Sequence, residues 1–174
     1  MNRHPLLAHP STPPAMNWRL EAGAWGIPGG LGLRFLLEGE VRRLRLGSSR
    51  GRAHELWKQT CFEAFLAAEG KPGYLELNVT PSGAWAAYGF EARRQGMRSL
   101  ELPQPPEIAT NRGDRSLEVT VQFRLPFAAP AWRLGLAAVL EEDEGTMSYW
   151  ALAHPGPRPD FHDPAGFLLE VAAA

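Results

Sequence analysis

Glu63 occupies the setting in this sequence that most strongly suggests binding chemistry. Within the apolar segment 60–66, successive side chains of a strand would alternate between two faces, so Glu63 shares a face with Cys61 and Phe65. A carboxylate between apolar side chains is costly unless it is paired or neutralised by a shifted pKa. Its partner could be a ligand, or an arginine such as Arg94, in which case Glu63 would be structural.

A second polar face is expected in the segment 74–80. There the odd-numbered residues are apolar, whereas Glu76 and Asn78 lie on the opposite face between Tyr74 and Thr80. This face can form hydrogen bonds to a ligand. For Glu76 alone, however, exposure to solvent on an antiparallel sheet is the simpler interpretation.

Trp57 is the aromatic residue best placed for ligand contact. Charged and polar residues flank it on both sides, which places it near the start of a strand with one ring face open. Tryptophan suits stacking on the apolar face of a pyranose ring. By contrast, Trp132 and Trp150 lie inside apolar strands and are predicted to be core residues.

Recognised catalytic motifs do not occur in the sequence. Cys61 lies in an apolar run, as a buried structural thiol would. We therefore predict no enzyme, and an acid–base pair of Glu63 and His162 is the enzymatic alternative. Four residues of the loop 154–164 have side chains that can bind metals: His154, Asp160, His162 and Asp163. Their spacing fits no metal-binding motif, and contacts within the loop explain them equally.

Haem is an alternative ligand, because haem iron can be held by methionine and histidine as axial ligands. The available side chains are Met97, Met147, His154 and His162. A chain that binds haem in this way would serve redox chemistry or electron transfer. No other cofactor is predicted.

Composition narrows the class of protein. The chain has 174 residues, enough for one domain with a single core. Its formal charge of −1 lacks the basic excess of a nucleic-acid or anionic-membrane binder.

Its single cysteine excludes an intramolecular disulfide and suits a reducing compartment. Residues 1–16 hold no signal-peptide core and no run of about 18 apolar residues occurs, so we expect a cytoplasmic protein.

Short apolar runs of period two, separated by glycine and proline turns, predict an all-β fold. The clearest run is 117–125, where apolar and polar residues alternate. Strands are expected at 18–20, 31–38, 41–46, 60–66, 74–80, 84–90, 117–125, 132–141, 147–152 and 167–171. We expect about ten to eleven strands in a β-sandwich of two antiparallel sheets, because several strands are apolar on both faces.

The remaining segments are expected to be short or irregular. Residues 1–16 read as an extended N-terminal segment before a single domain at 17–174. Short helices are possible at 52–58 and 91–96. The proline-rich segments 102–106 and 154–164 are expected to be loops, and long loops at the end of a sandwich commonly carry function.

The chain resembles DOMON-like proteins and the related family 9 carbohydrate-binding modules. The resemblance is carried by WKQTCFEAF at 57–65, YLELNVTPSGAWAAYGF at 74–90, SYWAL at 148–152, DFHDP at 160–164 and Phe167. It covers nearly the whole chain. It implies a β-sandwich that binds a sugar or haem and catalyses no reaction.

The resemblance also implies a binding site. In family 9 modules two aromatic rings clamp the terminal sugar, while a glutamate and other polar groups bind its hydroxyls. Trp57 and Glu63 match the first ring and the glutamate. The second ring corresponds to Phe161, where the family has tryptophan, and a polar loop position corresponds to Arg158. The strand arginine of the family is replaced in the region 76–78.

We therefore predict a non-catalytic module that binds a small molecule, first of all a sugar, and neither nucleic acid nor membrane. Haem binding is the alternative, and a protein-interaction module with a degenerate pocket is a further one. The predicted ligand-binding residues are Trp57, Glu63, Glu76, Asn78, Arg158, Phe161 and His162.

Overall fold

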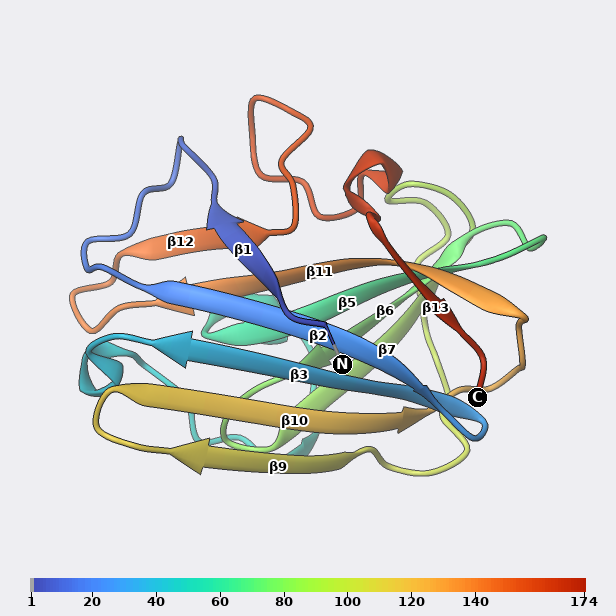
Figure 1. Cartoon of the computed structure of the whole chain (residues 1–174), viewed down its shortest axis with the longest axis horizontal. Helices are drawn as coiled ribbons and strands as arrows, with labels where there is room; N and C mark the ends of the chain where they lie inside the picture. Colours follow the sequence, from blue (N-terminus) through green and yellow to red (C-terminus); the bar gives the residue numbers. More distant parts are fainter. Residues whose placement is uncertain (1) are drawn as a thin grey trace.

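The computed structural model describes residues 2–174 and shows an all-β chain with a strongly curled sheet (Figure 1). The strands in these residues are β1 (His4–Ala8), β2 (Arg19–Ile27), β3 (Gly30–Glu38), β4 (Gly51–Arg52), β5 (Cys61–Ala68), β6 (Tyr74–Val79), β7 (Ala84–Phe90), β8 (Arg98–Ser99), β9 (Glu107–Arg112), β10 (Ser116–Arg124), β11 (Ala131–Glu141), β12 (Met147–Ala151) and β13 (Leu169–Ala172). Short 3-10 helices lie at η1 (Val41–Arg43), η2 (Leu56–Lys58) and η3 (Pro164–Gly166). Among the described residues, no helix has the length and apolar character needed to cross a membrane.

Hydrogen bonds connect the strands into one continuous path. Its order is β4-β7-β6-β5-β11-β12-β1-β2-β3-β10-β9, with β8 beside β7 and β13 beside β11. β1 links the two halves of this path, because Leu7 pairs with Ala151 of β12 and Leu6 pairs with Leu20 of β2. The predicted division into two antiparallel sheets is therefore not confirmed. The thirteen strands of residues 2–174 also exceed the ten to eleven expected.

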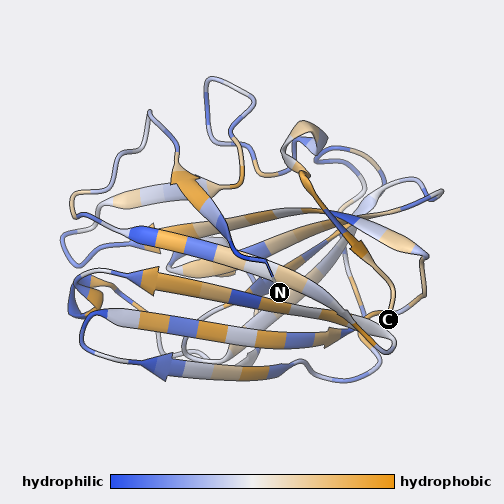
Figure 2. Ribbon diagram, viewed as in Figure 1, coloured by the Kyte–Doolittle hydropathy of each residue, from blue (hydrophilic) through white to orange (hydrophobic). Residues whose placement is uncertain are grey.

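The main core lies between the two halves of the curled sheet. Along β10 every second residue, from Leu117 to Phe123, is fully buried, and Figure 2 shows the alternation of apolar and polar residues on this strand. Phe35 of β3 stacks on Phe62 of β5 with ring centroids 4.9 Å apart, which joins one half to the other. Full burial of each such side chain stabilises the folded state by roughly 1.5–3 kcal/mol. The apolar residues at every second position therefore contribute much of the free energy that favours folding.

The strands β5, β6 and β7 are buried on both faces. Their inner residues join the main core, while η2 and the loops cover their outer face. Glu76 lies on this covered face and is only 3% exposed, so the expectation that it faces solvent is wrong. The outer face forms a second apolar cluster whose members include Leu56, Phe65, Tyr74, Tyr88, Phe90 and Phe167.

Several local expectations differ from the structure. The segment 41–46 forms η1 and a single bridge from Leu44 to Glu142 instead of a strand. The segment 52–58 begins with the last residue of β4 and is helical only in the short η2, and the segment 91–96 is a tight turn in which Arg94 has a positive φ of 56°. The sequence does not predict β1, which contains Pro5, or β9, which is polar and largely exposed.

Candidate binding site

A cavity of about 310 Å³ lies on the covered outer face of β5 and β6. Its volume is at the lower end of the range of about 300–1,000 Å³ that is typical of small-molecule sites. Strands β5, β6, β7, β11 and β12, helix η2 and the loops 91–97 and 152–163 all contribute to it. The lining residues are Trp57, Glu63, Glu76, Phe90, Arg94, Met97, Val139, Tyr149, Pro159, Phe161 and His162.

Small side chains beside Glu63 let the loop 159–162 pack close to the sheet. Ala137 of β11 lies opposite Glu63, and Ala151 of β12 lies opposite Ala137. These two alanines and Phe161 together line a second void of only about 10 Å³, so the loop fits closely against them. The position of Phe161 at the wall of the larger cavity therefore depends on the small size of its neighbours.

Glu63 is a buried carboxyl group with an unused oxygen. It is 3% exposed, and its Oε1 has no hydrogen-bond partner among the described residues. Arg94, the structural partner considered from the sequence, donates to Asp160 instead. Burial, together with the neighbouring Glu76 carboxyl, raises the pKa of Glu63 well above its ordinary value. The free oxygen of Glu63 is thus available to a ligand in the cavity.

Glu76 is the second carboxyl group of the cavity floor. Its Oε1 accepts a hydrogen bond from Asn78 Nδ2 at 2.8 Å, and its Oε2 lies 3.8 Å from His162 Nε2. Burial raises the pKa of Glu76 to about 7, although the Asn78 hydrogen bond and the Arg94 charge act in the opposite direction. Because like charges resist simultaneous ionisation in a buried site, Glu63 and Glu76 titrate as a pair.

His162 is held in one orientation by Tyr74. The Tyr74 hydroxyl lies 2.7 Å from His162 Nδ1, and its oxygen accepts the backbone N–H of Arg94 at 3.1 Å. With the hydroxyl proton donated to Nδ1, the neutral imidazole carries its proton on Nε2, which faces Glu76. Burial and the nearby Arg94 charge lower the pKa of His162 to about 4. His162 approaches Glu76, whereas the enzymatic alternative requires Glu63.

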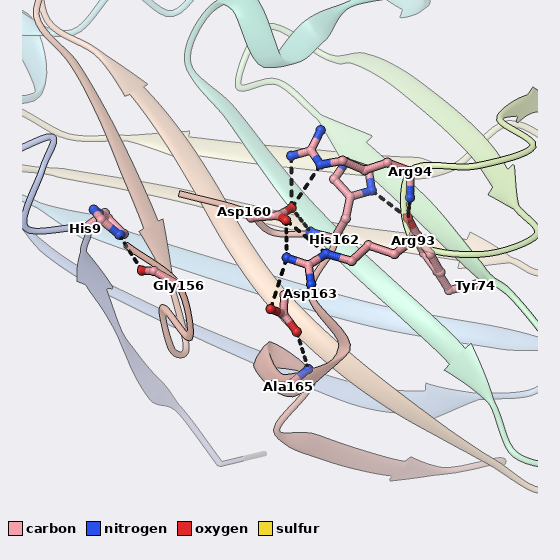
Figure 3. A network of polar contacts seen from close by, with 9 residues as sticks. All are labelled: His9, Tyr74, Arg93, Arg94, Gly156, Asp160, His162, Asp163 and Ala165. Atoms are coloured by element: carbon pink, nitrogen blue, oxygen red, sulfur yellow. Dashed lines mark hydrogen bonds and ion pairs between the residues drawn. The ribbon is translucent and has the colours of Figure 1, made fainter. Parts of the chain in front are cut away.

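An ion-paired cluster holds the loop of His162 against the neighbouring turn (Figure 3). We call its four residues, Arg93, Arg94, Asp160 and Asp163, the arginine clasp. Asp160 accepts from Arg94 Nη2 at 2.9 Å and from Arg93 Nε at 3.1 Å, and Arg93 also lies 3.1 Å from Asp163. Asp163 in turn accepts the Ala165 N–H at 2.9 Å and caps η3. The clasp connects the segments 91–96 and 158–163.

Aromatic rings form the walls of the cavity. Trp57 is half-buried on η2, and its ring lies edge-on to Tyr88 at a centroid distance of 5.9 Å. The Phe161 ring lies 6.1 Å from that of Tyr149 and 6.2 Å from that of Phe65. These contacts fix apolar ring surface beside the two buried carboxyl groups.

The structure brings most of the predicted site residues together. Asn78 is fully buried behind Glu76 and does not line the cavity. Arg158 is exposed and also lies outside the lining. The predicted residues that do line one cavity are Trp57, Glu63, Glu76, Phe161 and His162.

Sequence reasoning missed several residues of the site. Tyr149 of β12 lies opposite Val139 of β11, and both line the cavity. The signal for Tyr149 is present, because it alternates with the buried Ser148 and Trp150 along the strand. Tyr74 has no such signal, since its role depends on the turn that brings Arg94 to its hydroxyl.

Only two of the four candidate haem ligands line the cavity. Met97 and His162 line the cavity, whereas Met147 and His154 do not. His154 Nε2 instead lies 2.7 Å from the Leu7 carbonyl oxygen. Within residues 2–174, no group of three or more histidine, cysteine or acidic side chains is arranged to hold a metal ion.

Solved structures with a similar fold include carbohydrate-binding proteins. A candidate carbohydrate-binding protein from Bacteroides uniformis is 14% identical with a TM-score of 0.70, and the match covers 100% of this chain and 87% of that one. A family 9 carbohydrate-binding module from Caldicellulosiruptor kristjanssonii in complex with glucose is 9% identical with a TM-score of 0.62, over 92% and 79% of the two chains. A family 9 module from the same organism in complex with cellotriose is 10% identical with a TM-score of 0.63, over 99% and 82%.

No protein-family profile and no curated protein matches the sequence. The identities to the solved structures are low, so these similarities show the fold alone. The chain therefore shares the curled all-β architecture of family 9 carbohydrate-binding modules.

Proposed function

We propose that this chain is a non-catalytic module that binds a sugar in the cavity over β5 and β6. The observation that carries the proposal is the buried Glu63 carboxyl, whose unused oxygen adjoins a cavity with Trp57 and Phe161 on its walls. A sugar ring matches both features, because its C–H faces pack on aromatic rings and its hydroxyls hydrogen-bond to carboxyl groups. The fold similarity to modules in complex with glucose and cellotriose supports the same function.

The polar groups suit several hydroxyls of one ligand. The pair of Glu63 and Glu76 offers carboxyl oxygens, and His162 offers an Nε2–H donor. The volume of about 310 Å³ favours a small saccharide over a long enclosed chain. Together these features specify a monosaccharide or the end of a short oligosaccharide as the ligand.

We extend the proposal to the fold family. The chain would be a DOMON-like β-sandwich in which the two halves of the curled sheet act as its two layers. The stacking of Phe35 on Phe62 across the core supports this description. The resemblance of the segments 57–65 and 74–90 to that family supports it as well.

Trp57→Ala tests the aromatic wall of the site. Because Trp57 is half-buried on a one-turn helix, its loss should change the melting temperature little while it weakens sugar binding about tenfold or more. The wild-type chain is first screened by thermal shift against monosaccharides and disaccharides, since a ligand of the native state raises its apparent stability. Affinities for the sugars that bind are then measured by calorimetry.

Trp25→Ala is the matched control for this experiment. Trp25 is also half-buried, but it lies on β2 against Gly32 and outside the cavity. This variant should keep the sugar affinity of the wild type. Unchanged binding by Trp57→Ala, or the absence of any shift with every sugar in the wild type, would contradict the proposed function.

Haem binding is a second candidate, favoured by the presence of Met97 and His162 on one cavity. Tyr74 occupies Nδ1 of His162, which leaves Nε2 as the atom that would ligate iron. A titration with haemin distinguishes the two functions. Absence of a Soret band removes the haem candidate, whereas a band that disappears in His162→Ala identifies one axial ligand.

A further inference from the structure

The formal charges around the cavity do not balance. In the arginine clasp, two arginines face two aspartates, so the clasp is neutral as a unit. His162 is neutral above about pH 4 because of its lowered pKa. The carboxyl groups of Glu63 and Glu76 remain on the cavity floor, and no cationic side chain among the described residues pairs with Glu63.

The carboxyl groups of Glu63 and Glu76 on the cavity floor offer more acceptor oxygens than the chain supplies donors for. Glu63 Oε1 in the cavity lining, and Asn78 Oδ1 outside it, have no partner among the described residues. Glu63 and Asn78 lie directly opposite one another on β5 and β6. Buried polar atoms are rarely left unpaired, so the missing donor is either a proton on the carboxyl pair or a group of the ligand.

The walls of the cavity also favour a cation. Trp57, Tyr149 and Phe161 all line it, and the face of an aromatic ring carries partial negative charge. Aromatic faces attract an ammonium group, and a carboxylate forms strong charge-assisted hydrogen bonds to it. A neutral sugar would use the rings and leave the carboxyl pair protonated, whereas a bound cation would stabilise its ionised form.

We infer that the ligand itself brings the positive charge, and that the cavity selects amino sugars with a free ammonium group. An ammonium group has three N–H donors and no acceptor, which complements the unpaired Glu63 oxygen and the neighbouring Glu76 carboxyl group. N-acetylation removes the charge and adds an acceptor, so it removes the match. This inference rests on the proposed function of sugar binding and specifies the class of sugar.

The experiment compares matched sets of sugars that differ in one substituent. Each set contains the free amino sugar, the parent sugar with a hydroxyl and the N-acetyl derivative, in the glucose, galactose and mannose series. Calorimetry at about pH 6.5 keeps the amine protonated, as for an α-amino group of pKa about 7.7–8.0. The wild type should bind at least one free amino sugar about tenfold more tightly than its two matched sugars.

Glu63→Gln and Glu107→Gln distinguish the effect of the cavity carboxyl group from the effect of removing any one acidic side chain. Glu63→Gln should weaken binding of both sugars but should weaken that of the amino sugar more, so that the preference for the amino sugar falls to less than about twofold. Glu107→Gln removes an exposed charge from β9, so it should leave the preference unchanged. Thermal melts confirm that both variants are folded.

The other outcomes of this experiment contradict either this inference alone or both the inference and the proposed function. If, in every set that binds, the parent or the N-acetylated sugar binds the wild type as tightly as its amino counterpart, this inference is wrong and the proposed function stands. The carboxyl pair then binds neutral sugar as a protonated acid. If no member of any set binds, the proposed function fails and the inference fails with it.

Discussion

Two buried glutamates show how differently the same side chain can be used. Glu142 accepts hydrogen bonds from the Ala15 and Met16 backbone and from Trp18 Nε1, all within 2.9 Å. Its oxygens are satisfied within the protein, so its role is structural. Glu63 is equally buried, yet its Oε1 has no such partner. Unsatisfied acceptors in a cavity wall are therefore the feature of this chain that most directly indicates ligand binding.

Glu76→Gln should change how stability depends on pH. The ordinary pKa of this carboxyl is 4.5, and in the folded chain it is raised to about 7. Between these values the folded state holds a proton that the unfolded state has lost, so the stability from Glu76 is complete below about pH 4.5 and is lost as pH rises to 7. Because Glu63 and Glu76 titrate as a pair, the glutamine variant should gain about 1–3 kcal/mol relative to wild type across this window.

Urea unfolding at pH 4.5, 6 and 8 measures this difference. His162 acts in the opposite direction, since its lowered pKa makes its contribution fall as pH drops from 6.5 to 4. That contribution is present in both proteins and largely cancels when they are compared. A difference in unfolding free energy that stays constant with pH would show that Glu76 titrates normally.

Single residues could be predicted where strand alternation decides their environment. Glu63 is identified correctly as a buried carboxylate because apolar residues flank it on its own face. The burial of Glu76 is not predicted, because the polar face of β6 looks like a solvent-exposed face in the sequence. Glu76 is buried only because a loop covers this face in the folded chain. Asn78, predicted from the polar face of the segment 74–80, and Arg158, predicted from the resemblance, both lie outside the cavity lining, so neither kind of argument alone identifies which polar side chains reach a cavity.

At the scale of elements, strands with one buried face are predicted best. β10 has this pattern, and its expected bounds agree with the structure to within one residue. The segment 41–46 is also expected to be a strand, but Val41 and Leu44 reach the core from a 3-10 turn and its bridge instead. β9 has no apolar face, so only its pairing with β10 makes it a strand. Pairing between distant segments is the part that sequence patterns do not contain.

Asp160→Asn should loosen the arginine clasp without unfolding the chain. The ion pairs of Asp160 are partly exposed, so their loss should cost less than about 1 kcal/mol of global stability. Asp160 also accepts the His162 N–H at 3.1 Å, so its carboxylate organises both segments of the clasp. Hydrogen exchange should therefore become faster in 91–96 and 158–163, and sugar affinity should fall.

Glu101→Gln is the control for this variant. It breaks the exposed ion pair of Glu101 with Arg52, which lies outside the cavity lining. Exchange in the two clasp segments should remain as in the wild type. Equal exchange in the Asp160→Asn variant and the wild type would mean that packing of Phe161 and Phe167 alone positions the loop.

At the scale of the whole molecule, an all-β chain is predicted from the sequence and found. What the sequence does not show is the closure by β1, which lies in the expected N-terminal segment and pairs with β12 and β2. Proline at position 5 and the short length hide this strand from pattern analysis. The curled shape follows from this closure, and it has no local signature.

Leu6→Asp and Leu7→Asp test the contribution of β1. Leu6 is 2% exposed in the main core, whereas its neighbour Leu7 is 57% exposed. Burial of an unpaired charge at Leu6 should cost at least about 3 kcal/mol in urea unfolding, while Leu7→Asp should remain within about 0.5 kcal/mol of wild type. Equal stability of the two variants would show that β1 is dispensable for the fold.

The two alanines beneath Phe161 affect the width of the cavity but contribute none of its polar groups. Ala137 and Ala151 carry no polar group, yet the loop wall packs directly on them. A methyl group added at either position would lift this wall, while the carboxyl pair on β5 and β6 keeps its place in the sheet. Chains built on this plan can thus diverge in the width of the ligand they admit while the recognising groups stay the same.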